Sequence, residues 1–460
     1  MRDVQFHPLL LALAVSLAAC VPPKKPLPPE AAIQTPGQWR AASEPASAVR
    51  SDWWHNFNDP RLTRLVETAL EHNTDVLAAI SRVDAAREQI ALARSALFPS
   101  VNSSVATQTN RNLGTLGITH TRSAQPQVQI AYELDVWGRL RTLEQAARLQ
   151  YQASQTDRDA VLLTVASTTA RAYITLLSLD AQLQVTRETA ESCLGALKVA
   201  EDRAGEGYTS ELELTQAQSE YEAAMQMIPQ LQQAIRRQEN AIQVLTGALP
   251  APVNRGLHFQ DIHPPHVPGV LPSELLRRRP DVARAEQQLA ASDLNLEARR
   301  DEFLPQVQLS GSVGRLYVNS LNYDPIKVWS LGASILAPIF TAGRLEAQVN
   351  IATAQRNQAA YAYRAAALNA FADVENALSG VTLYAEQIDR IQARRRTLAR
   401  SLEIARDRYR SGYSSYLDEL DAQRNLFNLD LAAVQVRESQ LNNVISLYQA
   451  LGGGWAPARD

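Results

Sequence analysis

Cysteine is nearly absent from this chain, which has only Cys20 and Cys193 in 460 residues. Two thiols are too few for a disulfide framework or a cysteine-based metal site. The net charge is −3, so no strongly basic balance points to nucleic acid as a partner. The longest apolar run, residues 9–19, is too short for a membrane-spanning helix, which needs about 20 residues. No later segment resembles such a helix, so a helical membrane protein is not expected.

The N-terminus nevertheless carries a secretion signal. Arg2 precedes the apolar run, which ends in Leu17-Ala18-Ala19-Cys20 and resembles a bacterial lipobox. The resemblance implies that residues 1–19 are removed and that Cys20 receives lipid. A plain signal peptide with a coincidental cysteine is the alternative. With Cys20 modified, no disulfide within the chain is possible, and Cys193, on a heptad position, is expected to be a small buried hydrophobe.

The chain contains two copies of one unit of roughly 200 residues. Asp75 and Pro99 match Asp281 and Pro305 at an offset of 206, and Gly207-Tyr208 matches Gly412-Tyr413 at 205. In each copy a glycine follows a long helical pattern and another helical pattern comes after it, which is typical of a helical hairpin.

These signals divide the chain into six parts. We predict a lipoprotein signal peptide at 1–19, a Pro-rich lipidated tether at 20–52, repeat 1 at 53–247, an inter-repeat linker at 248–271, repeat 2 at 272–452, and a tail at 453–460. Helical structure is expected to open at Asp59-Pro60, with Asp59 as the N-cap.

Alternating apolar and polar residues predict two strands in each repeat. They cover residues 99–109, 124–137, 305–316 and 329–337, joined by polar loops at 110–123 and 318–327. Each is about as long as a tilted strand that crosses a membrane. Four strands cannot close a barrel, and open edges are costly in lipid, so three chains with twelve strands are the smallest assembly that leaves a pore. Soluble hairpins that pack their apolar face on helices are the alternative.

Long helices follow the second strand of each repeat. Residues 138–204 carry a heptad seam, and a return helix is expected at about 211–245. Copy two repeats the register. The first seam is formed by Leu176, Leu179, Leu183, Thr186, Ala190, Cys193, Leu197 and Ala200.

Several motifs together carry a family resemblance. They are Phe57-Asn-Asp-Pro-Arg-Leu62, Tyr132-Glu-Leu-Asp-Val-Trp-Gly-Arg139, Arg278-Arg-Pro-Asp-Val282, Pro338-Ile-Phe-Thr-Ala-Gly-Arg-Leu345 and Leu420-Asp-Ala-Gln-Arg424. In this order they resemble the outer-membrane efflux lipoproteins of the OprM type, within the TolC family. The resemblance implies a homotrimer with a 12-stranded membrane β-barrel and a long α-helical barrel, each chain supplying two tandem repeats of the order helix, strand, strand, long helix, helix. It also implies outer-membrane lipid, a periplasmic adaptor and an inner-membrane efflux transporter as partners, with this chain as the passive exit duct.

The resemblance also assigns functional residues. Leu417 and Asp421 match the rings that narrow the periplasmic gate, and Tyr409 and Arg424 match its holding contacts. Three Asp421 carboxylates would attract cations, and three Leu417 side chains would form a dewetting constriction. The resemblance places adaptor docking at the hairpin tips, residues 203–210 and 408–415. The docking residues are Arg203, Gly207, Tyr208, Arg408, Gly412 and Tyr413.

Alternatives remain at the level of function. A solvated helix face for Asp421 and a coiled-coil core position for Leu417 compete with the gate. The chain could instead serve type I protein secretion or metal-ion efflux, or be a lipid-anchored periplasmic coiled coil without a pore. His258, His263 and His266 in a Pro-rich loop could bind a metal. No nucleotide-binding loop, His-Glu-x-x-His motif or nucleophile elbow is present, so neither an enzyme nor a cofactor is expected.

Overall fold

The computed structural model describes residues 21–40, 49–114, 117–266, 269, 271–319 and 325–456. The predicted signal peptide, Cys20 and residues 457–460 of the predicted tail lie outside the described residues. The chain forms two compact units. The first contains Met1–Ile33, Ser81–Gln155 and Arg284–Ala365, and the second contains Gln34–Ile80, Thr156–Ala283 and Ala366–Asp460. Each unit takes segments from both repeats, so the sequence repeats are not separate domains.

The two repeats have elements of matching length. The long helices have 67 residues each, the return helices 35, and the helices before the strands 22. Repeat 1 consists of α3 (Thr74–Ser95), β1 (Ser100–Gly114), β2 (Gly117–Leu134), α4 (Arg139–Gly205) and α5 (Glu211–Leu245). Repeat 2 consists of α7 (Pro280–Asp301), β3 (Gln306–Val318), β4 (Ile326–Leu336), α8 (Arg344–Arg410) and α9 (Tyr416–Ala450). The predicted order of elements is therefore confirmed.

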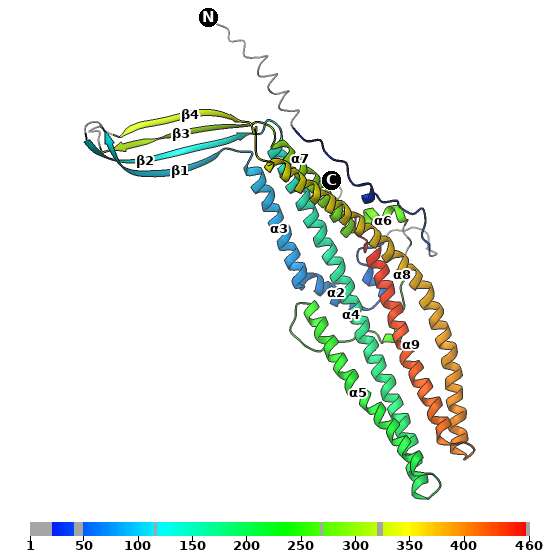
Figure 1. Ribbon diagram of the computed structural model, residues 1–460. Helices are drawn as coiled ribbons and strands as arrows, with labels where there is room; N and C mark the ends of the chain where they lie inside the picture. The colour runs from blue at the N-terminus through cyan, green and yellow to red at the C-terminus, as the bar shows by residue number, and fades with distance from the viewer. Residues whose placement is uncertain are drawn as a thin grey trace. The chain divides into compact units, whose positions relative to one another are not determined.

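The four strands of the first unit form one antiparallel sheet in the order β1-β2-β3-β4 (Figure 1). The register pairs Val101 with Ile130, Val128 with Val313, and Val313 with Trp329. Since side chains alternate between faces, this register gathers most of the apolar residues of the four strands on one face. That face is exposed in the single chain, with Leu331 and Ile335 among its uncovered side chains. A broad apolar face of this kind suits contact with lipid.

The predicted loop at residues 110–123 is wrong. Pairing continues from Asn110 opposite Thr121 to Gly114 opposite Gly117, so β1 and β2 extend well beyond the predicted boundaries. Apart from Leu113, Ile118 and the glycines, the added residues are polar, and a polar sequence remains in a strand where a partner strand satisfies its backbone groups. At the other end β2 stops at Leu134, three residues before the predicted end.

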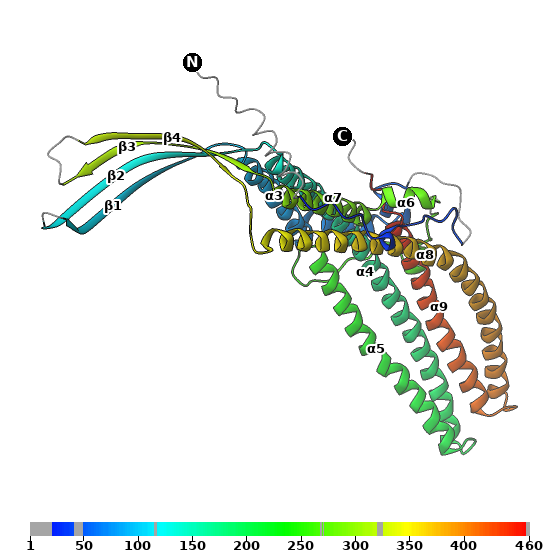
Figure 2. The ribbon, with the colours of Figure 1, turned by 45° about the horizontal axis from the view of Figure 1, so that its top comes forward.

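The second unit contains the C-terminal parts of α4 and α8 together with α5 and α9. Helices α5, α4, α9 and α8 lie side by side in this order in both views (Figures 1 and 2). Between α4 and α5, Leu176, Leu183, Ile235 and Ile242 form a buried cluster. The predicted seam of α4 is thus confirmed. The equivalent seam of α8 is only partly covered within the chain, since Val381 is exposed and Ile388 half-exposed.

Short helices and the linker pack on this layer. The 3-10 helix Trp53–Phe57 precedes α2 (Pro60–His72), and α6 (Pro272–Arg278) precedes α7. Asp59 caps α2 as predicted, since its carboxylate accepts from the amides of Arg61 and Leu62 at 2.7 and 3.3 Å. The same side chain accepts from the Tyr173 hydroxyl of α4 at 2.9 Å. The cap therefore also attaches α2 to α4.

The described start of the tether is bound rather than free. In the first unit Lys24 contacts Asp293 and Glu297 at 2.6 and 2.7 Å. Arg356, only 1% exposed, donates to the carbonyls of Lys25 and Pro26 at 2.7 and 3.1 Å. An extended Pro-rich segment leaves its carbonyls unpaired, and these buried arginine donors satisfy them. The first described residues of the tether predicted at 20–52 are therefore attached to the first unit.

Among the described residues, one helix, α4, contains an 18-residue stretch apolar enough to cross a bilayer. Half of that stretch is buried inside the protein, as in a core helix. The prediction that no segment is long and apolar enough was therefore wrong. A helix that packs against neighbours on two sides carries apolar residues on both of these faces, which raises its mean hydropathy.

Candidate functional site

The two helical hairpins turn through the same backbone motif. Gly207 has φ 76° and Gly412 has φ 79°, in the left-handed region that favours glycine. The amides of Tyr208 and Tyr413 donate to the carbonyls of Arg203 and Arg408, both at 2.8 Å. The glycine amides donate to the carbonyls of Ala204 and Tyr409 at 3.1 and 3.0 Å. This is the Schellman arrangement, in which glycine ends a helix and satisfies its last carbonyls.

Replacing Gly412 by alanine should open the second turn. A side chain at φ near +79° costs about 1–2 kcal/mol, although nothing lies within 4 Å of the added Cβ. Hydrogen exchange at residues 411–413 should therefore become faster. Gly195→Ala is the matched control, because Gly195 lies inside helix α4 with open space around it and its replacement should stabilise the helix. Equal exchange in both variants would contradict the role of the left-handed turn.

The tips expose large aromatic side chains. Tyr208 is 83% exposed and Tyr413 79% exposed, beside the open glycines. Arg408 is also exposed in the last turn of α8. These predicted docking residues thus lie on an accessible surface.

Arg203 lies in the last turn of α4, at the predicted hairpin tip, and its side chain makes contacts within the chain. Its guanidinium turns to the end of α8, where it donates to the carbonyls of Tyr409 and Arg410 at 3.1 and 2.9 Å. It also lies over the Tyr409 ring, 4.6 Å from the centroid. A cation at a helix C-terminus stabilises the unsatisfied carbonyls there. Arg203 therefore holds the first hairpin to the second within one chain.

A small apolar core lies between the hairpins. Tyr409 and Tyr416 are both buried, with ring centroids 5.5 Å apart. The Tyr409 hydroxyl has no hydrogen-bond partner among the described residues, and burial raises the pKa of Tyr409. The cluster packs residues of both hairpins together: Ala196, Leu197, Ala200, Ala217, Tyr409, Tyr416 and Leu420.

The predicted gate residues occupy one face of α9. Leu417 is 57% exposed in the single chain, which excludes a core position within it. Asp421 follows one turn later, is exposed, and accepts from the Asn425 side chain at 3.1 Å. Leu212 has the equivalent exposed position in repeat 1, but Gln216 stands where repeat 2 has Asp421. The acidic group is thus confined to the second hairpin.

Arg424 forms an ion pair within the single chain. Its guanidinium pairs with Glu220 of α5, and this hydrogen bond raises the pKa of Arg424. The pair joins α9 of repeat 2 to α5 of repeat 1. Tyr409 contributes through its backbone carbonyl and its ring rather than through its hydroxyl.

The sequence reasoning missed a second polar link. Arg406 of α8 contacts the buried Glu419 of α9 at 3.2 Å and the Ser192 hydroxyl of α4 at 2.8 Å. Gln423 donates to the same hydroxyl at 3.1 Å. Glu419 lies on the buried face of α9, at a position where the helical period expects an apolar residue. This carboxylate was the signal in the sequence that could have revealed the link. Next to this link, Cys193 is buried as predicted, and burial raises the pKa of its thiol to about 11.

A model of the family described as outer membrane efflux protein matches residues 65–248 and 271–453. The chain belongs to the outer membrane efflux protein family. The pyoverdine export outer membrane protein OpmQ of Pseudomonas putida is 32% identical over 98% of this chain and 97% of its own. The probable outer membrane lipoprotein SilC of Salmonella typhimurium is 31% identical over 97% of each chain. The outer membrane channel CmeC of Campylobacter jejuni has the same fold, with a TM-score of 0.87, 24% identity and 96% of each chain covered.

Membership of the outer membrane efflux protein family confirms the main predictions. The chain has the fold of the trimeric channels in this family, a β-barrel with an α-helical barrel built from two repeats. It is an outer-membrane efflux channel with a periplasmic helical extension. Other members of the family are channel proteins.

Proposed function

We propose that three copies of this chain form the passive exit duct of a tripartite pump for small toxic compounds or drugs. The observation that carries the proposal is the sheet of the first unit. Its apolar face is uncovered, and β1 and β4 each leave one edge unpaired in the single chain. In lipid, each unpaired backbone N–H or C=O group at an open edge costs several kcal/mol of free energy. Three sheets joined edge to edge remove every edge and enclose an open lumen.

We infer that a periplasmic adaptor docks on the two hairpin tips. The supporting features are the exposed Tyr208 and Tyr413 beside glycines that leave open space. A photo-crosslinking amino acid at either tyrosine should capture a periplasmic adaptor, identified by mass spectrometry, that itself binds an inner-membrane transporter. The exposed Leu249 in the linker provides the control position. Tips that crosslink no more adaptor than Leu249 would refute docking at the hairpins.

The gate is proposed to lie in the second hairpin. Leu417 and Asp421 are exposed in the chain and occupy the same face of α9. Tyr409 and Arg424 are engaged in contacts that connect this hairpin with the first. We infer that opening moves the second hairpin outward, while the first remains as a scaffold.

The substrate class is proposed from the relatives. OpmQ is named for pyoverdine export and TtgC of Pseudomonas putida for toluene efflux, both small molecules. The described residues contain no group of three or more His, Cys, Asp or Glu side chains that could hold a metal ion. We propose that the chain has no enzymatic activity and takes its energy from the inner-membrane transporter.

Lipid attachment at Cys20 is a further part of the proposal. The lipobox and the lipoprotein name of SilC support it. The tether is bound to the first unit from Pro22 onward, through Arg300, Lys24 and Arg356. A lipid on Cys20 would therefore anchor the barrel-forming unit to the membrane.

Cys20→Ser should abolish the lipid without removing the barrel. We expect the N-terminal peptide of the purified protein to lose the mass of its acyl chains, while heat-modifiable trimers persist because the strands insert independently. Cys193→Ser is the control, since it leaves the lipobox intact and should retain the acyl mass. An unchanged N-terminal mass in Cys20→Ser would rule out lipidation at this residue.

A further inference from the structure

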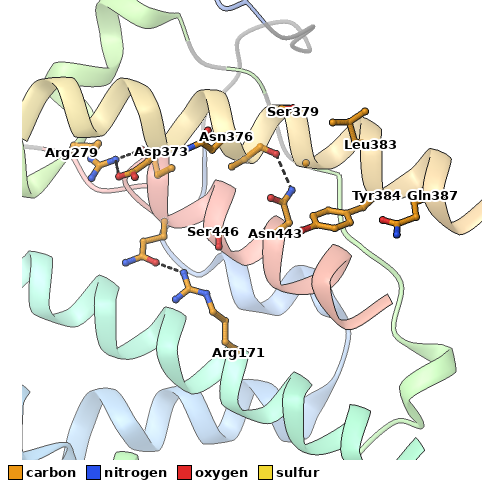
Figure 3. Close-up of a pocket in the computed structure, with 14 residues that line it drawn as sticks. Arg171, Arg279, Asp373, Asn376, Ser379, Leu383, Tyr384, Gln387, Asn443 and Ser446 are labelled. Atoms are coloured by element: carbon orange, nitrogen blue, oxygen red, sulfur yellow. Dashed lines mark hydrogen bonds and ion pairs between the residues drawn. The ribbon is translucent and has the colours of Figure 1, made fainter. Parts of the chain in front are cut away.

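A polar groove in the second unit lies over α9, between α8 and α4 (Figure 3). Its volume is about 740 Å³. Helices α8 and α9 contribute mostly amide and hydroxyl groups, and α4 contributes one arginine. The main polar side chains are Arg171, Asn376, Tyr384, Gln387, Asn443 and Ser446.

Contacts on α4 and α9 show which face of the layer carries the groove. Tyr173 of α4 donates to Asp59, and Tyr448 of α9 stacks on Trp53 with centroids 5.2 Å apart. These residues face the N-terminal segments. Residues two positions apart on a helix point about 200° apart. Arg171 and Ser446 therefore lie on the opposite face from the N-terminal segments.

Contacts of α8 also place its groove residue on the face opposite to the N-terminal segments. Phe371 packs on Trp39 with centroids 6.1 Å apart, and Glu375 accepts from the Arg40 amide at 2.6 Å. The groove residue Asp373 lies two positions from each of them and points away. Segments that cover one face of a barrel wall must lie outside if the barrel is to conduct. In the trimeric channel proposed above, the groove would therefore face the lumen.

Arg171 supplies a positive charge there that no acid neutralises. Its guanidinium donates to the Gln449 side chain, and no carboxylate in the described part of the chain lies within ion-pair distance of it. Burial lowers the pKa of Arg171, yet arginine stays protonated in proteins at neutral pH. The other charged side chains that line the groove, Arg279 and Asp373, contact each other at 2.9 Å, and Arg279 also contacts Asp281, outside the lining, at 2.7 Å.

We propose that Arg171 and its two symmetry copies form an anion-attracting ring in the lumen, which favours the passage of small carboxylate-bearing molecules. The proposal rests on the trimeric channel proposed above. It gives the duct two zones of opposite preference, an acidic one at the Asp421 position of the second hairpin and a basic one at the groove. A lumenal cation compensates part of the desolvation of a carboxylate that leaves bulk water.

Reversal potentials in planar bilayers test this ring. A unit charge about 8 Å from an ion path in water changes the local concentration of that ion about two- to threefold. The charge acts on potassium and chloride in opposite directions, so Arg171→Gln should raise the potassium-to-chloride permeability ratio roughly fourfold or more, and the potassium-to-glutamate ratio at least as much. Arg171→Lys keeps the charge and should retain the wild-type ratios.

Two further variants make the outcome decisive. Gln449→Glu places a carboxylate beside Arg171 and should reproduce the shift with the arginine retained, even if Arg171→Gln fails to assemble. Arg50→Gln removes a charge from an exposed N-terminal residue paired with Asp52, and should change nothing. If channels of Arg171→Gln or Gln449→Glu conduct with unchanged permeability ratios, the proposed ring is wrong. The same result would be seen if an acid of a neighbouring copy already neutralised Arg171, and the ring would be wrong in that case too. A wild-type protein that never conducts would instead refute the channel itself.

Discussion

Replacing Leu417 and Asp421 together by alanine is expected to raise the single-channel conductance severalfold in planar bilayers. Three Leu417 side chains would form an apolar constriction that excludes water, and three Asp421 carboxylates would narrow the same passage one turn away. Both side chains are exposed in the single chain, and neither belongs to the core between the hairpins. The double variant should therefore assemble normally and differ from the wild type in conductance.

The repeat provides a matched control for this experiment. Leu212 and Gln216 hold the equivalent positions in the first hairpin. Leu212→Ala with Gln216→Ala removes a similar volume but no carboxylate, and its conductance should stay close to that of the wild type. If the first-hairpin pair raised conductance and the second-hairpin pair did not, the gate would be assigned to the wrong repeat.

Gly314→Ala is expected to weaken the barrel strongly. A Cβ at this position would lie 2.5 Å from the Pro126 carbonyl oxygen and 2.7 Å from the Gln127 Cβ, closer than real contacts allow. These atoms belong to the β2–β3 pairing, which joins the strands of the two repeats. Relieving the clash should destabilise each chain by on the order of 1–3 kcal/mol, and the trimer contains three such sites. The temperature at which the trimer dissociates in electrophoresis should fall markedly.

Gly311→Ala controls for the change of residue type. Gly311 lies on the same strand, and the nearest atom to its added Cβ is 3.7 Å away, which is an ordinary contact. Alanine there should leave the dissociation temperature unchanged or slightly raised, since glycine is a poor strand residue. Equal losses at both positions would show that close approach at the repeat junction is not the cause.

Local signals in the sequence were sufficient for the elements themselves. The hairpin glycines, the Asp59 cap and the heptad seam of α4 each act over a few residues, so their spacing predicts where helices begin and end. The strand alternation predicts which residues share a face, and the observed register gathers them as expected. The strand ends were harder to predict, because strand pairing beyond Thr109 depends on the partner strand rather than on the residues' own apolar pattern.

Contacts between distant segments could not be predicted from single residues. Arg203 is indistinguishable in the sequence from a solvated arginine, and only the placement of the end of α8 beside it reveals its two carbonyl partners. The same holds for Arg356 with the tether and for Arg171 in the groove. Long charged side chains can serve many partners, and the fold of the backbone decides which partner is in reach.

The passive exit duct is tested most directly by recording from the purified wild-type protein in planar bilayers, with the Leu417→Ala, Asp421→Ala double variant beside it. We predict discrete channel openings for both proteins, with a low conductance for the wild type and a clearly larger one for the double variant. A folded, heat-modifiable trimer that conducts in neither form would contradict the account.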